Sequence, residues 1–205
     1  MTEDEDAARH RAKMARRKAA QDAEVASKTI EKGLLLVHTG PGKGKSTAAF
    51  GLALRALGRG WRVGVVQFVK GGEGWDPGER RALLAGFPGL VDWRTLGEGF
   101  TWETQDRARD EAAAARAWAA ARELMGDEGV RLLVLDELNI ALRYGQLPLG
   151  EVVAALRARR PALHVVVTGR NAKPEMIEAA DLVTEFGAVK HHFAAGVRAQ
   201  EGIEF

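Results

Sequence analysis

From Gly33 onward, short apolar runs alternate with longer segments in which apolar and charged residues are mixed. The apolar runs are typical of strands buried on both faces of a sheet, and the mixed segments are typical of helices. This alternation indicates an α/β fold with a mostly parallel sheet and helices on both faces. We predict strands at residues 34–37, 63–68, 132–135 and 163–168, and helices at 45–57, 104–125, 149–159 and 174–180.

Residues 1–32 differ in composition from residues 33–205, which we expect to form one domain. They contain no aromatic residue and few apolar ones. Six Lys or Arg residues and no acidic residue lie between Arg9 and Lys18. The composition favours a helix, but it provides too little apolar surface for a core. We therefore expect a basic arm that is helical or disordered alone and orders against another surface. A solvated tail and a nucleic-acid-binding arm are the alternatives.

Composition excludes several classes of protein. The 205 residues contain no cysteine, which excludes disulfides, thiolate metal sites and a cysteine nucleophile. No apolar stretch approaches the roughly 18–20 residues of a membrane span, and the acidic N-terminus does not resemble a secretory signal. The net charge of +2 gives no support to a nucleic-acid partner. We expect a cytoplasmic protein without a membrane or nucleic-acid partner.

A glycine-rich segment lies between the first predicted strand and the first predicted helix. Glycines there let backbone N–H groups turn toward a phosphate, and the helix N-terminus adds a positive field. Lys45 can reach the terminal phosphates, and Ser46 can offer its hydroxyl to Mg²⁺. Thr39 occupies the first glycine position of the general G-x-x-x-x-G-K-[ST] motif, so the loop is a variant. The candidate nucleotide-binding residues are Thr39, Gly40, Pro41, Gly42, Lys43, Gly44, Lys45, Ser46 and Thr47.

Two carboxylates, Asp136 and Glu137, directly follow the predicted strand at residues 132–135. Ligands of parallel sheets bind at this end of the strands, so Ser46, Asp136 and Glu137 are candidates to hold Mg²⁺. Glu137 is also a candidate base. Taken alone, such an acidic pair is equally typical of a helix N-cap. Which of the two carboxylates contacts Mg²⁺ directly stays open.

Two further segments carry candidate ligand contacts. Phe100 and Trp102 flank one residue in a glycine-rich segment, where they either cover the core or form a platform for a flat ligand. Arg170 and Asn171 follow the last predicted strand and suit a phosphate or a ribose. Nucleotide binding alone leaves hydrolysis, phosphoryl transfer and adenosyl transfer open. A motor ATPase acting on nucleic acid and a small-molecule kinase are therefore alternatives to an adenosyltransferase.

Six separated segments together resemble the ATP:corrinoid adenosyltransferases that have a phosphate-binding loop, namely residues 38–47, 65–71, 99–103, 135–144, 168–171 and 189–205. The resemblance implies a RecA-like fold, a homodimer and a role in adenosylcobalamin biosynthesis or salvage. The implied reaction transfers the 5′-deoxyadenosyl group of ATP to Co(I) of a corrinoid and releases triphosphate.

The resemblance also implies roles for particular residues. Phe100 and Trp102 match aromatic residues that displace the lower axial ligand of the corrinoid, and they join Lys45 of the phosphate loop and Glu137 of the acidic pair as catalytic candidates. Residues 1–32 match a segment that covers the bound corrinoid. ATP is expected to bind with Mg²⁺. The chain has no flavin or iron–sulfur motif, so we expect electrons from a partner such as a flavodoxin or a flavin reductase.

Overall fold

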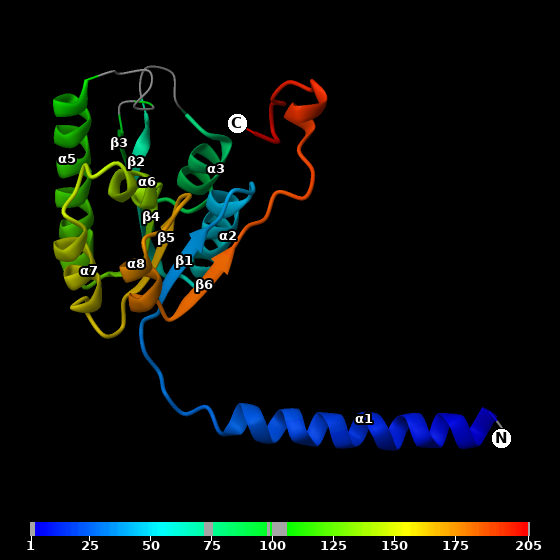
Figure 1. Ribbon diagram of the computed structural model, residues 1–205. Helices are drawn as coiled ribbons and strands as arrows, with labels where there is room; N and C mark the ends of the chain where they lie inside the picture. The colour runs from blue at the N-terminus through cyan, green and yellow to red at the C-terminus, as the bar shows by residue number, and fades with distance from the viewer. Residues whose placement is uncertain (1–2, 72–75, 98, 100–105, 205) are drawn as a thin grey trace. The chain divides into compact units, whose positions relative to one another are not determined.

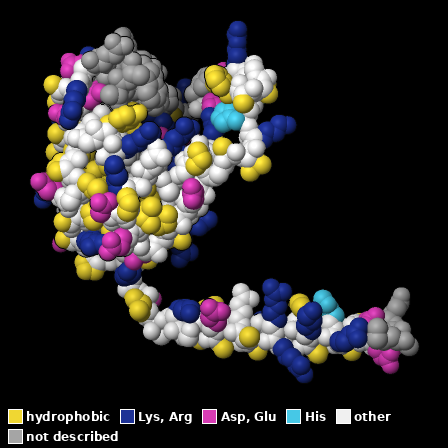
Figure 2. Space-filling model, viewed as in Figure 1, with side chains coloured by type: hydrophobic (Ala, Val, Ile, Leu, Met, Phe, Trp, Pro, Cys, Tyr) yellow, Lys and Arg dark blue, Asp and Glu magenta, His cyan; other side chains and the backbone are white. Residues whose placement is uncertain are grey.

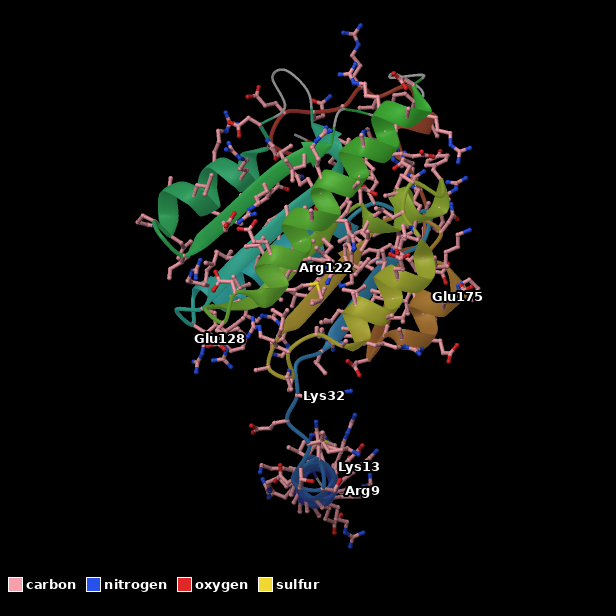
Figure 3. All side chains as sticks on the ribbon, turned by 90° about the vertical axis from the view of Figure 1, so that its left-hand side faces the viewer. Arg9, Lys13, Lys32, Arg122, Glu128 and Glu175 are labelled. Atoms are coloured by element: carbon pink, nitrogen blue, oxygen red, sulfur yellow. The ribbon has the colours of Figure 1, made fainter. Side chains whose placement is uncertain are left out.

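The structure is a computed structural model that describes residues 3–71, 76–97, 99 and 106–204. The chain divides into two compact units, Met1–Lys32 and Gly33–Phe205, and each is described here by itself. In the first unit, helix α1 (Glu3–Ala26) exposes its side chains along its whole described length. Figure 3 shows this helix end on, with side chains such as Arg9 and Lys13 radiating around it.

Helix α1 carries charges of both signs rather than an apolar stripe. Its Lys and Arg side chains all lie in the middle, between Arg9 and Lys18, and its acidic side chains lie toward the two ends (Figure 2). Arg9 pairs with Asp6 at 2.5 Å, and Lys18 pairs with Asp22 at 2.7 Å. Such exposed pairs within one helix add only a few tenths of a kcal/mol each, roughly, to helix stability. The helix therefore has no core of its own.

The second unit is built on a six-stranded sheet in which every neighbouring pair is parallel, in the order β3-β2-β4-β5-β1-β6 (Figure 1). The predicted α/β class with a parallel sheet is confirmed, and the arrangement fits a RecA-like fold. The strands are β1 (Leu35–Thr39), β2 (Arg62–Gly71), β3 (Val91–Gly97), β4 (Val130–Asp136), β5 (His164–Thr168) and β6 (Leu182–Glu185).

Helices cover both faces of this sheet, as predicted. One apolar cluster joins the sheet to helices α5 (Arg107–Gly126), α6 (Leu138–Arg143), α7 (Leu149–Arg157) and α8 (Pro174–Ala179). Figure 3 shows α5 and α7 side by side over this face. The other cluster joins the sheet to α2 (Lys45–Leu57) and α3 (Gly78–Gly86). A short 3₁₀ helix, His192–Ala195, follows in the C-terminal segment. No helix in the described ranges is long and apolar enough to cross a membrane.

The four strands and four helices expected from the sequence are present, with small differences at their ends. The helix predicted at 104–125 starts at Arg107, because the Asp106 side chain accepts the Arg109 N–H at 3.1 Å and caps it. The helices predicted to end at 159 and 180 end at Arg157 and Ala179. The pattern missed β3, β6, α3 and α6. Strand β3 has no apolar run because it carries Asp92 and Arg94, and Arg94 pairs with Asp92 and Glu123. Strand β6 needs no apolar run because all four of its residues are exposed.

His164, the first residue of β5, is held as a neutral ring. Its Nδ1 accepts the Leu34 N–H at 3.2 Å, so Nδ1 carries no proton. The ring stacks on Trp61, with 5.6 Å between ring centroids, and the Arg131 guanidinium lies 4.1 Å from the centroid of the same indole. Burial lowers the pKa of His164, and the charges of Arg131 and Arg159 lower it further.

We expect the free energy of unfolding to fall as the pH drops below about 6.5, the ordinary pKa of histidine. The unfolded chain takes up a proton at His164 in this range while the folded chain resists it, so acid favours unfolding. His164→Asn, which keeps an acceptor near the Leu34 N–H, should weaken this dependence without abolishing it, because burial also lowers the pKa of His38. Thermal melts at pH 8 and 5.5 test this. If the variant loses as much stability between pH 8 and 5.5 as the unmodified chain, His164 does not contribute to the pH dependence. At pH 8 histidine is neutral in both states, so a lower melting temperature of the variant there reports lost packing alone.

Candidate active site

The phosphate loop folds around its own lysine. Lys45 is the first residue of α2, and its ammonium donates to Gly40 O at 2.9 Å and to Gly42 O at 2.5 Å. Gly40 and Gly44 have φ values of 96° and 103°, which side chains rarely adopt. Burial lowers the pKa of Lys45, as do the charges of Arg170 and Lys70, while Glu137 raises it. Lys45 is thus a buried cation that now donates to carbonyl oxygens and can donate to phosphate oxygens instead.

The chain after β6 packs directly on this loop. Phe186 N–H donates to Thr39 O at 2.9 Å, and Gly42 N–H donates to Phe186 O at 2.6 Å. A Cβ at Gly40 would lie 2.6 Å from Phe186 O, and one at Gly42 would overlap Gly187 O. The sequence alone suggests one reason for these glycines, the close approach of a phosphate. Their second physical reason is the close approach of residues 186–187.

Asp136 is the buried centre of a polar cluster at the end of β4. It is 0% exposed, and its Oδ1 accepts the Ser46 hydroxyl at 2.7 Å and the Thr168 hydroxyl at 2.8 Å. Its Oδ2 accepts Gln67 Nε2 at 3.1 Å, and the Lys70 ammonium lies 3.6 Å away. These donors and the nearby cation offset the cost of burying a carboxylate. Ser46 and Asp136, both expected at a magnesium site, are thus joined by a direct hydrogen bond.

Glu137 stands at the N-cap position of α6 with a φ of 64°, but its side chain makes no capping hydrogen bond. Its backbone N–H donates to the Thr168 hydroxyl at 2.9 Å. The side chain instead lines the adjoining cavity, with Oε1 3.9 Å from the Lys70 ammonium. Burial raises the pKa of Glu137, and the neighbouring Asp136 raises it further. The carboxylate is thus directed to the cavity rather than to its helix.

A cavity of about 440 Å³ lies over the phosphate loop. Of the sequence-predicted residues, those that line it are Gly42, Lys43, Gly44, Lys45, Ser46, Thr47, Glu137 and Arg170. Those that do not line it are Thr39, Gly40, Pro41, Asp136 and Asn171. Asp136 lies beneath Ser46, and the Thr39 hydroxyl accepts the Ala172 N–H at 3.1 Å, which ties the segment after β5 to the loop. Phe100 and Trp102 lie outside the described residues.

Sequence reasoning missed several residues of this site. Lys70 borders the cavity between Ser46, Asp136 and Glu137, and Gln67 reaches Asp136 from β2. The available signal was that both are polar residues in an otherwise apolar strand. Glu204 also lines the cavity, pairs with Lys43 and lies 3.2 Å from His192 Nε2. No local pattern indicates the contact between Lys43 and Glu204, because these two residues are 161 positions apart in the chain.

A parallel sheet with a glycine-rich phosphate loop after β1 and an acidic pair at the end of β4 defines a P-loop nucleotide-binding protein. The family model described as "ATP:corrinoid adenosyltransferase BtuR/CobO/CobP" matches residues 31–205. A second model, "Cob(I)alamin adenosyltransferase N terminal", matches residues 1–25. The chain therefore belongs to the ATP:corrinoid adenosyltransferase family.

Curated relatives agree with this assignment over nearly the whole chain. A corrinoid adenosyltransferase of Pseudomonas aeruginosa is 56% identical, with 96% of each chain covered. One from Sinorhizobium is 52% identical over 98% of this chain and 94% of the relative, and one from Escherichia coli K12 is 45% identical over 96% and 98%. The protein is thus a transferase that moves the adenosyl group of ATP to a corrinoid. This finding decides against the motor ATPase and kinase alternatives.

Proposed function

We propose that the protein transfers the 5′-deoxyadenosyl group of ATP to Co(I) of a corrinoid and releases triphosphate, in adenosylcobalamin biosynthesis or salvage. The observation that carries this proposal is the cavity over the phosphate loop, which Lys45, Arg170 and Glu137 line together. The chain has no cysteine. A protein nucleophile is not needed, because the reduced cobalt of the corrinoid attacks the 5′ carbon itself.

Triphosphate is the leaving group of this reaction, so positive charge near the bridging oxygen lowers the barrier. Lys43, Lys45 and Arg170 line the cavity and are the candidates to supply that charge. Ser46 and Thr47 add hydroxyls at the N-terminus of α2. We assign Thr39, Gly40 and Pro41 to shaping the loop rather than to direct contact. Asn171, exposed beside Arg170, is proposed for the ribose or a phosphate.

The residues at this site fit Mg²⁺. The Lys70 ammonium lies 3.4 Å from Ser46 Oγ, 3.6 Å from an Asp136 oxygen and 3.9 Å from a Glu137 oxygen, so hard oxygen donors already surround a cation. Mg²⁺ commonly takes one or two carboxylates and completes its shell with water and substrate phosphates. We assign direct contact to Ser46 and Glu137, with Asp136 holding Ser46 from below. The ion would neutralise charge on the departing triphosphate.

The family resemblance supports further assignments. Phe100 and Trp102 are proposed to cover the lower face of the corrinoid, where their apolar rings would exclude water and a lower ligand. Residues 1–32 are proposed to cover the bound corrinoid. We further propose a cytoplasmic homodimer that receives electrons from a flavodoxin or a flavin reductase.

The products of the reaction test the proposed chemistry. The protein is incubated with ATP, Mg²⁺ and chemically reduced corrinoid while the cobalt spectrum and the phosphate products are followed. We expect the spectrum of an adenosylated corrinoid together with one triphosphate per corrinoid. Release of ADP and phosphate in that proportion would contradict attack at the 5′ carbon.

In the same assay, Phe100→Ala and Trp102→Ala should keep ATP binding and keep activity with corrinoid that is already reduced. Both variants should lose activity when cobalt must be reduced on the protein, because a lower ligand makes Co(II) harder to reduce. Unchanged turnover with in situ reduction would remove the proposed role of these rings.

A further inference from the structure

Gln67 is a buried amide in the middle of three neighbouring strands. It lies on β2, 1% exposed, and is in register with Thr95 on β3 and with Asp136 on β4. Residues in register on adjacent strands direct their side chains to the same face of a sheet. Trp93 lies two residues before Thr95 and therefore on this face too. The four side chains form one connected polar row beside the phosphate loop.

The chemistry of the row fixes which way the amide points. The Trp93 indole N–H lies 3.1 Å from Gln67 Oε1, and an indole nitrogen can only donate. The Thr95 hydroxyl donates to the same oxygen at 3.0 Å. Gln67 Nε2 must then face β4, where it donates to Asp136 Oδ2 at 3.1 Å. Turning the amide over would set its NH₂ group against the indole N–H.

This fixed donor determines how the Asp136 carboxylate is oriented. With Oδ2 held by Gln67, Oδ1 is left to accept the hydroxyls of Ser46 and Thr168. We propose that Gln67, locked by Trp93 and Thr95, is a positioning residue that orients Asp136 and through it the Ser46 hydroxyl in the nucleotide–magnesium site. This inference rests on the proposed function, since that site is part of it.

The row also connects the site to residues that do not touch a ligand. Gln67 borders the cavity, but Trp93 and Thr95 do not line it. Trp93 has a second contact, with the ring of Phe50 on α2 at 5.0 Å between centroids, and Phe50 does line the cavity. Variants at Trp93 and Thr95 therefore probe the hydrogen-bonded row without removing a group from the cavity.

The first test titrates ATP binding with Mg²⁺ by calorimetry in the full chain. Gln67→Met fills a similar volume and cannot donate, so the half-saturating Mg²⁺ concentration should rise by up to about tenfold. This is the lower end of the loss seen when a direct partner of a metal ligand is removed, because Gln67 acts on Ser46 through Asp136. Thr95→Val should raise it in the same direction by a smaller factor. The double variant should be no worse than Gln67→Met, because both changes break one chain of contacts. Additive losses, or an unchanged Mg²⁺ dependence, would overturn the proposal.

A matched variant separates positioning from packing. Val65→Ala lies two residues before Gln67 on the same strand and face, and it opens a cavity in the core. It should lower the melting temperature while leaving the Mg²⁺ dependence as it is in the unmodified chain. If Val65→Ala shifts the Mg²⁺ dependence as much as Gln67→Met does, the role of Gln67 is structural only.

The second test reads the row directly through the ¹⁵N-indole signal of Trp93, assigned with Trp93→Phe. Adding Mg²⁺ and ATP should shift this signal in the unmodified chain and leave it in place in Gln67→Met. A shift that persists in Gln67→Met would run through Phe50 and would overturn the inference. Neither test depends on which products the enzyme releases. A chain that yields ADP refutes the proposed reaction, whereas one that yields triphosphate with no effect of Gln67→Met refutes only the positioning role.

Discussion

Lys45→Met is expected to lower kcat/KM for ATP by about 10²–10³-fold, the range observed when a preorganised group that stabilises developing charge is removed. Methionine retains the length of the side chain and removes only its charge. Lys45 is 7% exposed, and its ammonium is held between Gly40 O and Gly42 O. A triphosphate entering the cavity meets this cation with little competition from water. The measurement is steady-state adenosylation with reduced corrinoid in excess.

Lys43→Met is the matched control in the same loop. The Lys43 side chain is about half exposed and already pairs with Glu204, so the charge it offers is partly neutralised and screened by water. Its loss should cost at most about tenfold, on the scale of a single partly solvated charge. Circular dichroism and a thermal melt check that both variants fold. Equal losses in the two variants would refute the special position of Lys45.

Asp136→Asn is expected to reduce kcat/KM by about 10²-fold and to increase the Mg²⁺ required for half-maximal rate. An asparagine must turn its NH₂ group away from Gln67 Nε2, which is itself a donor fixed by Trp93. In the variant that NH₂ group faces the hydroxyls of Ser46 and Thr168, which in the unmodified protein donate to the carboxylate. Because these donors lose a charged acceptor, we also expect about 1–3 kcal/mol lower stability.

Asp181→Asn is the control that separates the two effects. Asp181 accepts the Leu35 N–H at 2.9 Å and pairs with Arg159 at 3.2 Å, at the opposite end of β1 from the phosphate loop. Its replacement should lower the melting temperature and leave the Mg²⁺ requirement unchanged. If both variants show the same Mg²⁺ requirement, the loss in Asp136→Asn comes from destabilisation, and Asp136 has no part in holding the ion.

The sheet and the phosphate loop could be predicted because their signals are local. A buried parallel strand needs a short apolar run, and a loop between strand and helix that brings its backbone close to another group needs glycines. Strands β3 and β6 lacked that signal. Half-buried β3 carries Asp92 and Arg94, whose charges are balanced partly by Glu123 on α5, and β6 pairs along only one of its edges.

The surroundings of the acidic pair could not be predicted, because they come from distant parts of the chain. Asp136 stood out at the end of its strand, but its donors Ser46, Gln67 and Thr168 come from three other elements. Their approach depends on strand order, which apolar patterns do not encode. The same holds for Lys70, whose charge in a buried strand was visible while its partners were not. Family resemblance supplied the reaction, and the packing supplies the reason why these side chains meet.

Phe186 joins the outermost strand of the sheet to the phosphate loop through its own N–H and C=O groups. The segment that follows an outermost strand ordinarily tolerates insertions and deletions well. Here one residue inserted next to Phe186 would move the carbonyl that accepts the Gly42 N–H, and deletion of Phe186 would remove it. The number of residues in the segment after β6 is thus constrained by the phosphate loop about 145 positions earlier. Substitutions in this segment should therefore be tolerated more readily than insertions or deletions.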